Sequence, residues 1–161
     1  MQPYVYFKWD ISQLAEAHSI SFLEAEETLR DGRKIGFILE YKARYLIEGG
    51  RRSKEYAGWD IETSDGSHHE VRGITKYGIS FASSKNIGTG RAFNEGDFLD
   101  KLESVKSFIL VDVTRNSIDG VKSAPVFLID KWTVLKWWED GDLGPIAKIS
   151  YKKIIKLLEK V

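Results

Sequence analysis

Residues 58–73 read GWDIETSDGSHHEVRG and decide the fold, because they contain two short extended patterns joined by a strong turn signal. Asp65–Gly66 is a pair that favours a tight hairpin turn between two strands. Side chains two apart on a strand share one face, so Glu70 and Arg72 are predicted to point the same way. Asp60 lies ten positions before Glu70, across the turn. The hairpin can therefore bring these two carboxylates close together.

Helical and extended patterns alternate on both sides of this hairpin, which predicts an α/β fold with a mixed sheet flanked by helices. Residues 10–30 are expected to form two short helices capped by Asp10 and Ser21. We therefore divide the chain into a short helical N-terminal appendage, residues 1–33, and an α/β domain, residues 34–161. The other expected elements are helices over 35–48, 97–105, 131–141 and 149–161 and strands over 78–82, 107–113 and 124–130.

Composition limits the possible chemistry. The 161 residues include no cysteine, which excludes disulfides, thiolate zinc sites and cysteine nucleophiles. No apolar run reaches the roughly 20 residues of a membrane span, and no signal-peptide layout opens the chain, so we expect a cytoplasmic protein without a membrane partner. The 24 basic and 24 acidic residues cancel, yet the segment 71–94 contains four bases and no acid. A local basic surface is therefore expected in a neutral protein.

Two carboxylates that converge on one point repel each other unless a proton or a cation lies between them. Mg²⁺ prefers oxygen ligands and keeps several waters, so Asp60, Glu70 and the carbonyl of Val71 are our candidate metal ligands, with Mn²⁺ able to substitute. Such a metal would polarise a phosphate and lower the pKa of an attacking water. The alternative is a solvated hairpin on which Glu70 and Arg72 form an ordinary surface ion pair.

The pattern GWD followed by HHEVRG resembles the PD-(D/E)xK restriction-endonuclease-like nuclease superfamily, over roughly residues 35–130. The resemblance implies a restriction-endonuclease-like fold, Mg²⁺-dependent cleavage of DNA, and a homodimer or a nuclease subunit of a larger assembly. It places the family's aspartate on Asp60, its glutamate on Glu70 and its lysine on Arg72. It also implies a further acid on the preceding helix, for which Glu40 is the candidate.

Two departures separate the chain from that family pattern. Trp59 stands where the family has proline, and Arg72 stands where it has lysine. Arginine stays protonated in proteins, so Arg72 can neutralise charge and bind phosphate but cannot easily act as a general base. Lys76 or Lys85 could supply that role from the basic segment.

The basic segment after the hairpin is rich in glycine and hydroxyl side chains, a composition suited to phosphate contacts. A surface loop without a ligand explains the same composition. The nucleic-acid-binding candidates are Lys76, Ser83, Ser84, Lys85, Asn86 and Arg91.

Two other functions remain open. The chain also faintly resembles archaeal tRNA-splicing endonucleases, which cut RNA without a metal; the candidates there are Tyr56, His68 or His69, and Lys106. His68, two residues before Glu70, could alternatively assist proton transfer beside the carboxylates. The third possibility is a non-catalytic nucleic-acid-binding module with a nuclease fold, which Arg72 and the neutral total charge favour.

Overall fold

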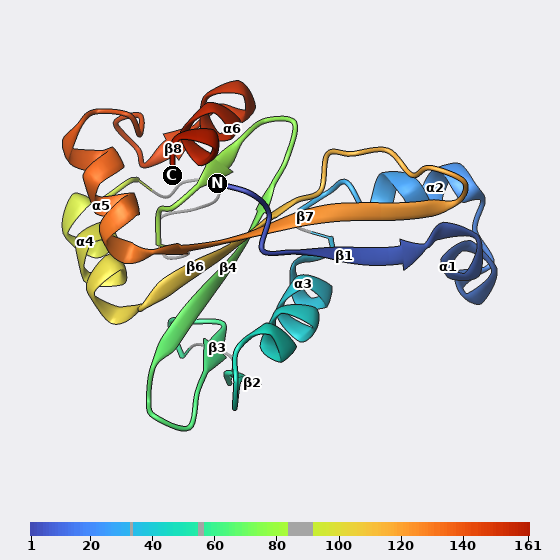
Figure 1. The fold of residues 1–161 in the computed structure, drawn as a ribbon, viewed down its shortest axis with the longest axis horizontal. Coiled ribbons are helices and arrows are strands. Elements are labelled where there is room, and N and C mark those ends of the chain that lie inside the picture. Colours follow the sequence, from blue (N-terminus) through green and yellow to red (C-terminus); the bar gives the residue numbers. More distant parts are fainter. Residues whose placement is uncertain (33, 55–56, 84–91) are drawn as a thin grey trace.

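A six-stranded mixed sheet runs through the computed structural model, which describes residues 1–32, 34–54, 57–83 and 92–161 (Figure 1). Its strand order is β1-β7-β6-β4-β3-β2. Only the β4–β6 pair is parallel in this sheet; the other neighbours are antiparallel. The strands are β1 (Val5–Asp10), β2 (Arg51–Arg52), β3 (Ile61–Glu62), β4 (His68–Ile74), β6 (Ser107–Asp112) and β7 (Val121–Asp130).

The parallel pair at the centre follows from the helix that connects its two strands. Helix α4 (Glu95–Ser104) lies between β4 and β6 in the chain, and a crossover helix is the usual connection between parallel strands. All six residues of β6 are buried. The continuous apolar run over 107–113 thus forms the buried strand that it predicts.

Helices cover both faces of this sheet, and the alternation of side chains along β6 shows the two cores. Phe108 and Leu110 belong to the cluster under α4, α5 (Lys131–Glu139) and α6 (Tyr151–Lys160). Ile109 and Val111 belong to the opposite cluster under α3 (Gly36–Ala43). The predicted mixed α/β architecture with helices around a sheet is therefore confirmed at this level.

The N-terminal segment differs from the helical appendage predicted for residues 1–33. Strand β1 pairs with β7 over six positions, so residues 5–10 are part of the main sheet. Helices α1 (Ile11–His18) and α2 (Phe22–Thr28) lie at the far end of the long β1–β7 ribbon (Figure 1). Their predicted caps are confirmed, because Asp10 accepts a hydrogen bond from Gln13 N and Ser21 forms a capping box with Glu24.

Two other elements depart from the predicted pattern. The helix expected over 35–48 ends at Ala43 and continues as the 3-10 turn η1 (Arg44–Leu46). The strand expected over 78–82 is the short β5 (Ile79–Ser80), which pairs with β8 (Lys148–Ile149) in a separate two-stranded sheet. No helix in the described part of the chain has the length and apolar character to cross a membrane.

Candidate active site

The turn of the central hairpin fixes the register of its two strands. Gly66 has φ +78°, and the Asp65 carboxylate accepts hydrogen bonds from Ser67 N and from the Thr63 hydroxyl. The Thr63 hydroxyl, followed by the Ser67 groups, lowers the pKa of Asp65 to about 2. The resulting register pairs Ile61 with His69. Asp60 directly precedes Ile61 and Glu70 directly follows His69, so the hairpin brings these two residues to neighbouring places.

Asp60 immediately precedes β3 and is tied to β4 by two hydrogen bonds. Its backbone N–H donates to His69 O at 3.1 Å, and its Oδ2 accepts from Val71 N–H at 2.8 Å. The N–H and C=O of one strand residue point to the same edge. The carbonyl of Val71 thus faces the side of β4 on which Asp60 lies, as a shared metal site requires.

Glu70 is a buried carboxylate, only 2% exposed, held between two cations. Its Oε1 lies 2.5 Å from Arg72 Nη2, and Lys101 Nζ contacts its Oε2. Burial raises the pKa of Glu70, and the nearby charge of Asp60 adds to that rise, whereas Arg72 and Lys101 oppose it. Glu70 is therefore not on a solvated hairpin, and the ordinary surface-pair interpretation is wrong for it.

Lys101 is the site residue that sequence reasoning missed. It comes from α4, and its Nζ also donates to the carbonyl oxygen of Gly58, just before Asp60. Phe98 and Leu102 place that face of α4 in the core, and Lys101 lies next to them on the helix. The helical spacing could have indicated a lysine directed at the sheet, but no local signal indicates that Glu70 would lie opposite it.

Glu40 lies on α3, on the face of the sheet opposite α4, and its carboxylate approaches Asp60 from there. Its Oε2 is 2.6 Å from Arg52 Nε. Burial raises the pKa of Glu40 and Asp60 contributes to the rise, against the pull of Arg52 and Arg72. Asp60 thus adds to the raised pKa of both glutamates, whereas Arg52 and Arg72 oppose the rise at Glu40, and Arg72 and Lys101 oppose it at Glu70.

A cleft of about 870 Å³ opens beside this region. Glu40, Asp60, Val71 and Arg72 line one part of it. Neither Glu70 nor Lys101 lines it. The Nε of Arg72 is buried and makes no hydrogen bond within the described part of the chain, so this guanidinium retains a donor for a ligand.

The predicted nucleic-acid contacts divide into three groups. Lys76 is exposed on the wall of the cleft, with its Nζ 5.0 Å from the centroid of the Tyr77 ring. Ser83 is 8% exposed, so its hydroxyl is not offered at the surface as the sequence suggested. Ser84, Lys85, Asn86 and Arg91 lie outside the described residues.

The residues of the metal-independent alternative lie apart from the cleft. His68 stacks on Trp59 with ring centroids 3.5 Å apart, and its Nδ1 is 3.1 Å from Ser104 O. His69 is buried with its Nδ1 2.7 Å from Ser107 Oγ, and burial lowers its pKa. Lys106 donates its backbone N–H to His68 O. Tyr56 lies outside the described residues.

The donors available to a metal are oxygens. Among residues 1–32, 34–54, 57–83 and 92–161, no three His, Cys, Asp or Glu side chains form a group that could hold a metal ion. Asp60, Glu70 and the Val71 carbonyl, completed by waters, form a donor set of the kind that Mg²⁺ accepts. No protein-family model matches the chain, and no curated protein matches it significantly.

Proposed function

We propose that this protein is a Mg²⁺-dependent DNA endonuclease, or the nuclease subunit of a larger assembly. The observation that carries the proposal is the contact of Asp60 with β4 next to Glu70, where its carboxylate accepts a hydrogen bond from Val71 N–H. Asp60, Val71 and Arg72 line the cleft, and Arg72 is the ionic partner of Glu70. The mixed sheet, the helix before the hairpin and the Asp, Glu and Arg positions support the resemblance to the PD-(D/E)xK nucleases.

The raised pKa values of Glu70 and Glu40 support a site that gains from a bound cation. Each carboxylate is hard to ionise where it lies, chiefly because of burial, and Asp60 increases the difficulty. A divalent cation held by Asp60, Glu70 and the Val71 carbonyl would remove that repulsion. When bound, it would supply Lewis-acid activation of a phosphodiester and a water of lowered pKa.

The two cations beside Glu70 would have separate roles. Arg72 stays protonated and can bind a phosphate oxygen through its unpaired Nε, which stabilises negative charge on the reacting phosphate. Lys101 carries an amine that can lose its proton, so it is our candidate for the proton-transfer role that Arg72 cannot fill. We place Lys101 ahead of Lys76 in that role because Lys101 contacts Glu70 directly. Lys85 lies outside the described residues.

The experiment is a cleavage assay with supercoiled, linear and single-stranded DNA in Mg²⁺ or Mn²⁺. We expect wild-type cleavage that a chelator abolishes, and loss of cleavage in Asp60→Ala and Glu70→Ala while the circular dichroism spectrum is kept. Glu62→Gln is the matched control, because Glu62 is a neighbouring acid on the same hairpin and pairs with Arg51. Cleavage of both strands with one site per chain would use a homodimer.

Three results would contradict this proposal. RNA cleavage that survives the chelator and Asp60→Ala would favour the metal-independent ribonuclease. DNA binding without cleavage of any form would favour the non-catalytic module. Equal loss of cleavage in Glu62→Gln would show that hairpin stability, rather than the carboxylate pair, controls the assay.

A further inference from the structure

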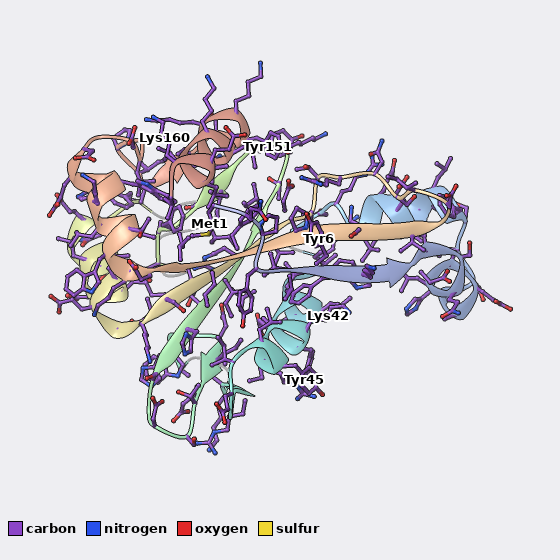
Figure 2. The ribbon with its side chains drawn as sticks, in the orientation of Figure 1. Met1, Tyr6, Lys42, Tyr45, Tyr151 and Lys160 are labelled. Atoms are coloured by element: carbon purple, nitrogen blue, oxygen red, sulfur yellow. The ribbon has the colours of Figure 1, made fainter. Side chains whose placement is uncertain are left out.

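Three aromatic side chains form an exposed row along α3 and η1. Phe37, Tyr41 and Tyr45 are four residues apart in sequence and are 57%, 49% and 76% exposed. Figure 2 shows Tyr45 on the outer side of this segment. The core-facing side of the same helix carries Leu39 and Ala43, both buried. The row is therefore not part of the hydrophobic core.

Two arginines lie between these rings. The guanidinium of Arg52 is 4.9 Å from the Phe37 ring centroid and 5.3 Å from that of Tyr41. The guanidinium of Arg44 is 5.5 Å from the Tyr41 centroid and 4.5 Å from that of Tyr45. Rings and guanidinium groups thus alternate in the order Phe37, Arg52, Tyr41, Arg44, Tyr45, which we name the aromatic–arginine ladder.

The exposed rings of the ladder are not needed to form the hydrophobic core. Large exposed rings gathered on one face commonly mark an interaction site. The Nε of Arg44 is buried and has no hydrogen-bond partner in the described part of the chain. The ladder itself carries two arginines, of which Arg52 is also paired with Glu40. The chemistry of the ladder suits an anionic partner with flat apolar groups.

We propose that the aromatic–arginine ladder binds unpaired nucleotides of the DNA substrate, with bases stacked on the rings and phosphates paired with the arginines. Stacking on aromatic side chains with cationic contacts to the backbone is how proteins hold single strands. A second copy of this chain fits less well, because a two-fold contact pairs this surface with itself and so brings arginines of one copy near arginines of the other. A DNA strand would instead bring phosphates to them.

The ladder is linked to the candidate active site through one side chain. Arg52 contacts Phe37 and Tyr41, and its Nε lies 2.6 Å from the Glu40 carboxylate that lines the cleft. A strand lying on the ladder would thus reach the cleft beside Asp60. This inference rests on the proposed nuclease function and narrows its substrate to DNA with a single-stranded tail or gap, since a blunt duplex keeps its base faces stacked.

The test is fluorescence anisotropy with labelled DNA in excess chelator, where no metal-dependent cleavage takes place. Three DNAs of matched sequence are compared: a blunt duplex, the duplex with a single-stranded tail, and the single strand. We expect wild type to bind the tailed and single-stranded DNAs more tightly than the blunt duplex. Tyr41→Ala/Tyr45→Ala should weaken binding of those two DNAs on the order of tenfold or more and leave the blunt duplex nearly unchanged.

Two control variants separate stacking from other effects. Tyr41→Phe/Tyr45→Phe keeps both rings and should bind as wild type does. Trp132→Ala removes another exposed aromatic with a lysine over it, on α5, and should also bind as wild type does. Circular dichroism melting checks that every variant is folded, and sedimentation measures its oligomeric state.

The inference is overturned if wild type shows no preference for tailed DNA, or if the double alanine variant binds tailed DNA as wild type does. It is also overturned if that variant dissociates a dimer while its DNA binding is unchanged, which would assign the ladder to a second copy. Because binding is measured without metal, tail preference in a protein that never cleaves DNA would refute the proposed function and leave this inference standing.

Discussion

Replacing Lys101 by methionine should lower the single-turnover rate of DNA cleavage by about 10²–10⁴-fold, the usual contribution of a positioned acid–base group. At 1.36 kcal/mol per tenfold, the activation free energy rises by about 3–5 kcal/mol. Lys101 has this influence because it contacts a Glu70 carboxylate that is 2% exposed, where little water screens the charge. The neighbouring Arg72 cannot release its proton and so cannot substitute.

Lys101→Met should lower the free energy of unfolding by much less than it raises the activation free energy of cleavage. Glu70 keeps Arg72 at 2.5 Å, so one of its two ionic partners remains. Loss of one charged hydrogen-bond partner at a buried site costs about 1–3 kcal/mol, which is below the 5–15 kcal/mol stability of a typical domain. Lys101→Met should therefore fold, and its thermal melting measures that cost.

The assay is single-turnover cleavage with enzyme in excess, followed across pH. Lys101→Arg keeps the charge but replaces the amine with a guanidinium that stays protonated, so it should be impaired. Lys136→Met is the matched control, because Lys136 is an exposed helical lysine paired with Asp140 on α5. Wild-type rates in Lys101→Arg would show that only its charge matters. A Lys101→Met cleavage rate within about threefold of the wild-type rate would refute both the proton-transfer role and the charge role of Lys101.

Two further predictions concern pH. Burial raises the pKa of Glu70, and a protonated carboxyl cannot hold a cation. Mg²⁺-dependent cleavage should therefore fall on acidification at a pH above the ordinary glutamate value of 4.5. A pH–rate profile in which cleavage falls only at or below pH 4.5 would contradict this prediction. Burial lowers the pKa of Lys122 from 10.5 to about 8. Between pH 8 and 10.5, Lys122 therefore carries a proton in the unfolded chain but not in the folded chain. The free energy of unfolding should rise with pH over that range by up to about 3 kcal/mol relative to Lys122→Met. Urea unfolding of both proteins at the two ends of that window measures the difference, and parallel pH dependence would exclude it.

The parts of the fold that sequence predicted depend on local signals. The Asp65–Gly66 turn and the alternation on either side of it predict a hairpin, and the observed register pairs Ile61 with His69, the residues next to Asp60 and Glu70. The caps at Asp10 and Ser21 depend on side chains that bind backbone groups three residues away. Such interactions are encoded within a few residues, so one sequence suffices to find them.

The parts that sequence missed depend on contacts between distant segments. Strand β1 is an edge strand whose partner β7 begins more than one hundred residues later, and of its six residues only Phe7 is buried. Lys101 becomes a site residue only because the β4–α4–β6 crossover brings α4 over β4. Helical spacing in residues 35–48 indicated a helix but not its orientation, and Tyr45 within that range is exposed.

Charge balance at the site explains how a neutral protein could act on a polyanion. The acids Glu40, Asp60 and Glu70 are equal in number to Arg52, Arg72 and Lys101, so these six side chains carry no net charge when all are ionised. Mg²⁺ bound without DNA would leave two uncompensated positive charges in a poorly hydrated region. A phosphodiester bound without Mg²⁺ would be repelled by three carboxylates. Mg²⁺ and two backbone phosphates together restore neutrality, because the +2 charge of the metal equals the charge that the two phosphates bring. Arg72 and Lys101 could then leave Glu70 to the metal and turn to phosphate oxygens. Metal and DNA would thus each remove the electrostatic cost of binding the other, and basic total charge is not required for the site to hold both.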